Sequence, residues 1–324
     1  MIIALCSVLT VGVVAAGGIP VILDNIKSIP GFFEFFGIAQ PQVVDGVQQL
    51  DAAGNPLFGP AGQYGFLTII STLSWGLGYF GMPQVLLRFM AINKSAELTK
   101  SRRIATIWCV ISLLAAVAIG LTGRTLYPAA LLTRSSSENI FIIMSTGLLP
   151  AFLAGIVMSG ILAATMSSSD SYLLIASSAV ARDIYKGIFK KDATDRQVML
   201  VSRITLLLVS LFGIIIALDE NSVIFKVVSF AWAGFGATFG PIILFSLFWK
   251  RTTRAGAIAG MVTGGSMVFI WNKLISKLGG VFAIYELFPA FVLSSIAIVV
   301  VSLLTKKPDQ AILDEFEAAK TYEC

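Results

Sequence analysis

Residues 139–169 read NIFIIMSTGLLPAFLAGIVMSGILAATMSSS, a run without a single Lys, Arg, Asp or Glu. A helix needs about 20 mostly apolar residues to cross the hydrocarbon core of a bilayer. The run is long enough for one membrane crossing, and it is not isolated in the chain.

Seven further runs of the chain lack charged residues, and each approaches or exceeds the length of a membrane-spanning helix. They are residues 1–23, 52–87, 104–123, 204–218, 227–249, 255–272 and 287–305. Strands of a membrane barrel would instead alternate apolar and polar residues over about ten positions. The sequence therefore predicts an all-α bundle with about eight transmembrane helices.

The composition agrees with lipid as the main solvent. Of the 324 residues, 56% are hydrophobic and 13% are charged, and the mean hydropathy is +0.88. The first run lacks a Lys or Arg ahead of its apolar core and has no obvious small-residue cleavage site before Asp24. We interpret it as a membrane span and not as a secretory signal.

The positions of the basic residues predict the orientation in the membrane. Four segments carry 17 of the 23 Lys and Arg residues, namely 88–103, 182–203, 250–254 and the chain after 305. By the positive-inside rule this side is cytoplasmic, and so are both ends of the chain. We therefore expect a multi-pass plasma-membrane protein with one bundle over residues 1–307 and a short amphipathic cytoplasmic tail over 308–324, and no nucleic-acid partner.

The residue types disfavour an enzyme. The sequence contains no His, and Cys6, Cys109 and Cys324 are far apart. This pattern argues against a zinc site, histidine catalysis or a disulfide framework. We expect no cofactor.

A first candidate site lies in residues 74–90, which read SWGLGYFGMPQVLLRFM. Three glycines and Pro83 weaken a helix inside an apolar span, and broken membrane helices mark binding sites. Trp75, Tyr79 and Pro83 recur every four residues, so on an α-helix they share one face that offers aromatic rings and a hydroxyl to a small solute. The alternative is ordinary aromatic packing. Arg88 ends this run, either as an anchor at the membrane surface or as a gating ion pair.

A second candidate site lies in a long helix expected from about Pro150 to Tyr185. Its middle reads ILAATMSSSDSYLLIASS, at residues 161–178. Ala164, Ser167 and Ser168 follow i, i+3, i+4 spacing and offer a carbonyl and two hydroxyls to a hard cation such as sodium. The alternative is close helix packing with hydroxyls bonded back to their own helix. Asp170 is costly inside a membrane and could attract the cation.

A third segment, residues 230–246, contains Gly236 and Gly240 in GxxxG spacing, followed by Pro241. We expect close helix packing or a hinge at this point.

On these residues the chain resembles the sodium/solute symporter family, and within it the branch that carries proline. The most specific stretches are WGLGYFGMPQVLLRFMA at 75–91, GILAATMSSSDSYLLIASSAVARDIYK at 160–186, VSFAWAGFGATFGPIILFSLFWKRTTRAGAIAGM at 228–261 and YELFP at 285–289.

The resemblance implies a leucine-transporter-like core of two inverted five-helix repeats followed by two extra helices. It places Met1 in the fifth core helix, so the first four core helices are missing from this chain. It also matches Trp75, Tyr79 and Pro83 to proline-binding positions and Ala164, Ser167 and Ser168 to the sodium site. The chain departs from the proline branch at Met82, Gln84, Ser168 and Asp170.

The implied function is sodium-coupled uptake of a small solute, L-proline by resemblance, through alternating access. A symporter for another amino acid, a vitamin or a sugar is the main alternative. A membrane sensor without transport and a non-functional fragment also stay open, whereas charge rings of a channel are not found. Without its partner helices, the chain is expected to insert in membranes but not to transport alone.

Overall fold

The computed structural model describes residues 2–92, 94–218 and 223–321. Met1 and Cys324, the first residue of the expected bundle and the last of the expected tail, lie outside the described residues. The chain forms two compact units. Unit 1 comprises residues 1–62 and 106–223, and unit 2 comprises residues 63–105 and 224–324.

Unit 1 is mainly helical, with a few two-residue strands in the connection after its first helices. Its helices are α1 (Ile2–Ala15), α2 (Ile19–Lys27), most of α5 (Ser95–Leu126), α6 (Arg134–Ser137), α7 (Ile140–Leu148), α8 (Ala151–Ser178), the π-helix η2 (Ala179–Phe189) and α9 (Asp195–Ala217). Its strands are β1 (Gly37–Ile38), β2 (Val43–Val44) and β3 (Val47–Gln48), with β4 (Gly62–Gln63) at the boundary with unit 2. Strands β2 and β3 pair antiparallel.

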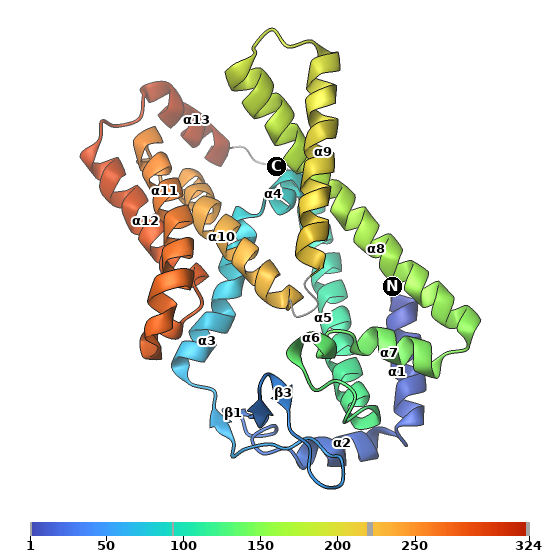
Figure 1. The fold of residues 1–324 in the computed structure, drawn as a ribbon. Helices are drawn as coiled ribbons and strands as arrows, with labels where there is room; N and C mark the ends of the chain where they lie inside the picture. The colour runs from blue at the N-terminus through green and yellow to red at the C-terminus, as the bar shows by residue number, and fades with distance from the viewer. Residues whose placement is uncertain (1, 93, 219–222, 322–324) are drawn as a thin grey trace. The chain divides into compact units, whose positions relative to one another are not determined.

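The apolar core of unit 1 lies where α1, α5, α7 and the first turns of α8 meet. Figure 1 shows α7 beside α1, and α9 running along α8 to form a long hairpin. The buried residues of this core are Val8, Ile119, Met144, Leu149, Ala154 and Val157. Beyond Val157, α8 contributes little to the core.

The first expected span is broken into two helices. Helices α1 and α2 meet at an angle of 78°. Gly17 and Gly18 form the corner with φ angles of 86° and 100°, a conformation that glycine adopts without a steric cost. The expected crossing 1–23 is thus a bent pair in the structure.

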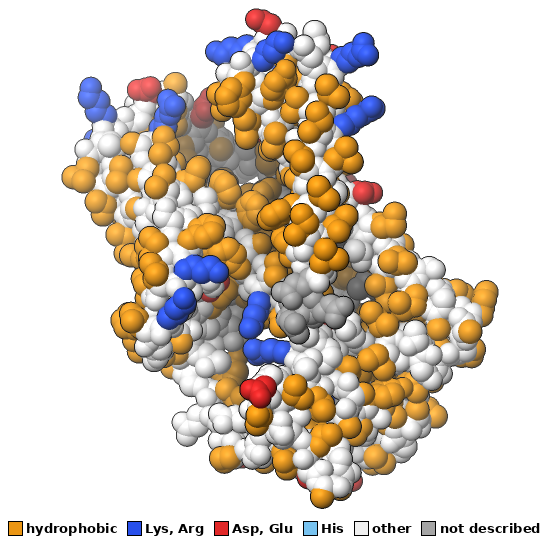
Figure 2. Space-filling view, viewed as in Figure 1, with side chains coloured by type: hydrophobic (Ala, Val, Ile, Leu, Met, Phe, Trp, Pro, Cys, Tyr) orange, Lys and Arg blue, Asp and Glu red, His pale blue; other side chains and the backbone are white. Residues whose placement is uncertain are grey.

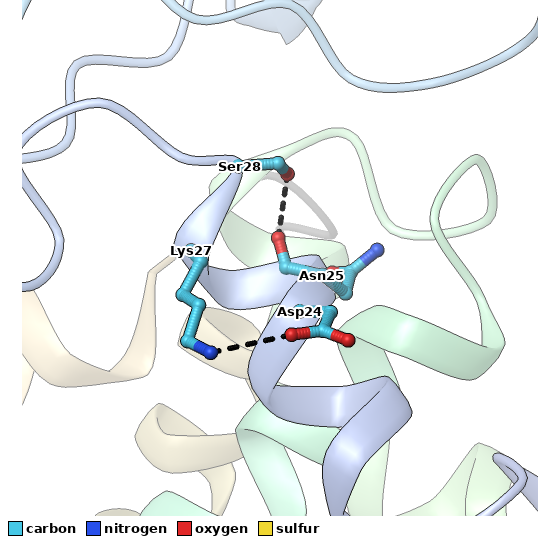
Figure 3. A network of polar contacts seen from close by, with 4 residues as sticks. All are labelled: Asp24, Asn25, Lys27 and Ser28. Atoms are coloured by element: carbon cyan, nitrogen blue, oxygen red, sulfur yellow. Dashed lines mark hydrogen bonds and ion pairs between the residues drawn. The ribbon is translucent and has the colours of Figure 1, made fainter.

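The end of α2 carries a small polar network (Figure 3). The Lys27 ammonium lies 3.3 Å from a carboxylate oxygen of Asp24, and the Ser28 hydroxyl donates to the Asn25 carbonyl at 2.6 Å. Both charged side chains are largely exposed, so this pair contributes at most about 1 kcal/mol. These contacts lie at the C-terminal end of α2, where the connection begins.

Unit 2 is built around three long helices and one broken segment. Its elements are α3 (Phe66–Leu73), the 3-10 helix η1 (Ser74–Gly81), α4 (Pro83–Met90), α10 (Ile224–Phe248), α11 (Arg254–Ile270), the short π-helix η3 (Trp271–Ile275), the short 3-10 helices η4 (Ser276–Leu278) and η5 (Gly280–Ala283), α12 (Leu287–Leu304) and α13 (Gln310–Thr321). Helices α10, α11 and α12 lie against one another, as Figure 1 shows, and η1 packs on α10.

Small residues allow the close approach of the helices in unit 2. Its buried core consists of Ala233, Ala237, Val268, Leu287, Ala290 and Phe291. Gly256, Gly260 and Gly264 are buried on the face of α11 that packs on its neighbours. The Ser294 hydroxyl of α12 donates to the Gly260 carbonyl at 2.8 Å. The polar groups therefore connect helices while the glycines keep them close.

Among the residues that the structure describes, six helices are long and apolar enough to cross a membrane, and up to seven if the bent pair α1–α2 is one span. Two of the uncharged runs do not each form one continuous helix. Residues 52–65 are not helical, so that run supplies only the short helices from Phe66 onward. The run 139–169 is divided at Leu149 and Pro150, because a proline lacks the amide hydrogen that a continuing helix needs, and the long helix starts at Ala151 and extends to Phe189.

The α8–α9 hairpin carries the surface expected of a membrane segment. Figure 2 shows hydrophobic side chains along the hairpin and basic side chains gathered at its closed end. None of the described residues of α9 is buried, although its sequence is strongly apolar. An apolar helix with exposed sides is stable when lipid surrounds it.

Candidate functional site

The segment expected to break does break. Helix α3 passes directly into the 3-10 helix η1, which ends at Gly81. Met82 is extended, with φ −83° and ψ 115°, and Pro83 then starts α4 at its first position. Pro83 fits there because the first turn of a helix needs no amide hydrogen from that residue.

The expected shared face of Trp75, Tyr79 and Pro83 was wrong. That expectation assumed α-helical geometry, in which residues four apart lie on one side. Residues 74–81 form a 3-10 helix with three residues per turn, and Pro83 belongs to the next helix. Trp75 and Tyr79 nevertheless contact one common side chain, the indole of Trp232.

Trp75 lies within a group of stacked aromatic rings. Its indole is nearly parallel to Phe225, Trp232 and Tyr285, at centroid distances of 5.4, 5.5 and 6.0 Å. The Trp232 indole nitrogen donates to the Trp75 carbonyl at 2.9 Å. Trp75 is partly buried, whereas the side chain of Tyr79 is half exposed. Tyr79 is thus the more accessible of the two rings.

The glycines of the broken segment pack on the GxxxG segment of α10. A Cβ atom on Gly78 would collide with the Trp232 indole, and one on Gly81 would collide with the Phe235 carbonyl. Gly236 in turn lies against the Gly78 main chain. The expected close packing at Gly236 and Gly240 is confirmed, and its partner is η1.

The second candidate group lies on a regular part of α8. Ala164, Ser167 and Ser168 fall inside Ala151–Ser178, so their expected helical spacing is confirmed. They are exposed, as is the whole of 162–172. The neighbouring hydroxyls of Thr165 and Ser171 donate to the carbonyls of Ile161 and Ser167.

The hydroxyls of Ser167 and Ser168 behave differently from these neighbours. Within the described part of the chain they form no hydrogen bond. Thr165 and Ser171 thus show the expected alternative, in which a hydroxyl bonds back to a carbonyl of its own helix. Two hydroxyl oxygens of α8 stay open to another ligand.

The two remaining candidates are also exposed. Asp170 lies on α8 and Arg88 near the end of α4. Arg88 and Asp170 belong to different units, as do the aromatic group and the serines. The candidate substrate site is therefore described within unit 2, and the candidate sodium site within unit 1.

Sequence reasoning missed three residues of this region. Trp232 and Tyr285 lie in the quoted stretches FAWAG and YELFP, but only the glycines of the first were interpreted. Aromatic residues inside a glycine-rich span were the available signal. The third is Glu286, which is buried just before α12 and accepts a hydrogen bond from the Asn272 amide at 3.2 Å. Burial raises the pKa of the Glu286 carboxyl above its usual value.

The fold and these segments define a multi-pass α-helical membrane protein with a broken helix and an intramembrane polar stretch. The family model described as "Sodium:solute symporter family" matches residues 1–264, which include both candidate groups. The chain belongs to this family.

Several curated relatives are similar to this chain. A sodium/proline symporter of Haemophilus influenzae is 44% identical over 258 residues, covering 78% of this chain and 51% of the relative. The high-affinity proline transporter PutP of Bacillus subtilis is 42% identical over 251 residues, covering 77% and 52%. A sodium/proline symporter of Staphylococcus aureus is 43% identical over 249 residues, covering 75% and 49%. The chain spans about half the length of these relatives.

Proposed function

We propose that this chain carries the substrate- and sodium-binding parts of a symporter that takes up L-proline with sodium. The observation that supports this most strongly is its 42–44% identity to relatives named as proline transporters. The broken helix of unit 2 and the polar stretch of α8 supply the two kinds of site that such a function needs.

The substrate site centres on the broken segment. Tyr79 presents its half-exposed ring and hydroxyl to the solute, and Trp75 forms the aromatic wall behind it. An aromatic face attracts a cationic ammonium group and packs on an apolar ring, and proline offers both, since its secondary ammonium is part of its ring. Pro83 starts the second half of the broken helix, and the positive end of that helix's dipole favours a carboxylate.

The sodium site uses α8. The Ala164 carbonyl and the hydroxyls of Ser167 and Ser168 are hard oxygen donors, the type that an alkali cation prefers. Asp170, on the same exposed stretch, attracts the cation electrostatically. Three ligands from one helix are fewer than sodium needs, so the remaining oxygens come from another part of the transporter.

Sodium entry drives solute entry by alternating access around these sites. Each sodium charge that moves inward gains about 2.3 kcal/mol per 100 mV of membrane potential. We place the basic loops and both ends of this chain in the cytoplasm, because most Lys and Arg residues lie in those connections. Arg88 then lies at the cytoplasmic surface as an anchor.

The test is uptake of radiolabelled L-proline into proteoliposomes under a sodium gradient. It is run on this chain and on the chain with any coding sequence that precedes Met1 restored. Ser167→Ala and Ser168→Ala should each raise the sodium concentration for half-maximal uptake, by about tenfold for the loss of one charge-assisted contact. Ser171→Ala is the matched control, because its hydroxyl is bonded to the Ser167 carbonyl. Unchanged sodium dependence in both serine variants would contradict the proposed sodium site. If another amino acid, a vitamin or a sugar inhibited the uptake of labelled proline more strongly than unlabelled proline does, that compound would replace proline as the proposed substrate.

A further inference from the structure

Trp232 of α10 contacts three residues of the broken segment, namely Trp75, Gly78 and Tyr79. Its indole N–H donates to the Trp75 carbonyl at 2.9 Å, and its ring stacks on Trp75 at 5.5 Å with an interplanar angle of 13°. The Tyr79 ring forms a T-shaped contact with it, with ring centroids 4.7 Å apart and an interplanar angle of 83°. The indole also lies directly on the main chain of Gly78, where no Cβ would fit.

The hydrogen bond from Trp232 is important because its acceptor, the Trp75 carbonyl, belongs to the main chain of η1. A 3-10 helix has poorer internal hydrogen-bond geometry than an α-helix and rarely extends beyond three or four residues, yet η1 contains eight. Carbonyls in such a segment need further donors in an apolar surrounding. The Trp232 N–H supplies one at the second residue of η1.

The ring contact with Tyr79 has a separate consequence. Tyr79 is half exposed, so its ring could adopt several orientations. The edge-to-face contact with Trp232 favours one of them, because aromatic quadrupoles attract in this geometry. Trp232 thus fixes both the main chain and the exposed ring of the candidate substrate site.

We propose that Trp232 is a positioning residue for substrate binding, which holds the η1 segment through the Trp75 carbonyl and orients Tyr79 toward the solute. The role in transport rests on the proposed function of this site. The positioning of η1 itself does not, and a measurement without any substrate can test it.

The first measurement is amide hydrogen exchange over residues 74–81 in detergent or nanodiscs. Trp232→Phe keeps an aromatic ring and removes the N–H donor, so exchange in η1 should rise about fivefold or more. Trp249→Phe is the matched control. It makes the same chemical change near the end of α10, where the ring packs on Phe245, outside the site. Equal exchange of residues 74–81 in the two variants would overturn the proposal.

The second measurement is proline uptake under the conditions given above. Trp232→Phe should raise the proline concentration for half-maximal uptake about tenfold and leave that for sodium unchanged. A parallel loss for both, together with less folded protein, would show a merely structural role and overturn the substrate-positioning part. If the wild-type protein moves no proline, the proposed function fails, and the exchange result still decides whether Trp232 holds η1.

Discussion

The hydroxyl of Tyr285 donates to the main-chain carbonyl of Ser229 at 2.6 Å, which joins the start of α12 to α10. The Tyr285 amide donates to the Ser71 hydroxyl of α3 at 3.1 Å, and the Tyr285 ring stacks on Trp75. One residue thus connects three parts of unit 2 around the broken segment.

Tyr285→Phe should lower the free energy of unfolding by about 1 kcal/mol, because the Ser229 carbonyl loses its donor in a partly buried position. The ring and its stacking stay. Thermal unfolding in detergent measures the change. Tyr185→Phe serves as the control, since the Tyr185 hydroxyl has no hydrogen bond within the described residues, and an equal loss in both variants would contradict the role of the Ser229 contact.

Replacing the glycines of η1 with alanine should destabilise the protein by an amount that depends on what each added Cβ meets. Gly81→Ala should destabilise the protein by about 1–3 kcal/mol, because the added Cβ meets the main chain of α10, which cannot move aside easily. Gly78→Ala should cost a similar amount, because the added Cβ meets the Trp232 indole, which its hydrogen bond and ring stacking hold in place. Thermal unfolding of the purified variants measures both costs.

Gly76→Ala is the internal control for this series. A Cβ at Gly76 meets no atom within 4 Å, so its unfolding temperature should stay close to that of the wild type. If all three substitutions had the same effect, helix propensity and not packing on α10 would explain the glycines.

The sequence predicted the helical class, the break near Pro83 and the regular helix through Ser167, because uncharged runs, glycine clusters and proline have local physical effects. It did not predict that η1 is a 3-10 helix, since the choice depends on contacts of Gly78 and Gly81 with α10. For the same reason it could not find the Trp232–Trp75 hydrogen bond, which joins residues 157 positions apart. The ligand roles of Ser167 and Ser168 stay predictions.

Glu286 predicts a pH dependence of stability. Its raised pKa means that the folded protein keeps the proton at pH values where the unfolded chain, near the usual value of 4.5, has lost it. The stability from this group is therefore complete below about pH 4.5 and is lost as the pH rises through the folded-state pKa. Glu286→Gln should remove this loss and keep the hydrogen bond from Asn272.

The measurement is the unfolding temperature of the wild type and of Glu286→Gln between pH 4 and 8, in one detergent. The two curves should meet at low pH and separate as the pH rises, with the variant more stable at neutral pH. Glu34→Gln, at an exposed position of unit 1, controls for the change in net charge. A variant that is less stable at every pH would instead show that the carboxylate is needed.

Trp75 could act as a wall of the substrate site or only as a packing residue, and these two roles have different kinetic signatures. If it forms the wall of the substrate site, Trp75→Ala should raise the proline concentration for half-maximal uptake by at least tenfold and change the sodium dependence little. If it only packs against Phe225, Trp232 and Tyr285, the same substitution should reduce the amount of folded protein and affect both ligands equally. Trp108→Ala, on the exposed surface of α5, controls for the loss of an indole elsewhere in the membrane region. Uptake normalised to the amount of folded protein, at fixed sodium and then at fixed proline, separates the two roles, since only a substrate wall changes the response to proline alone.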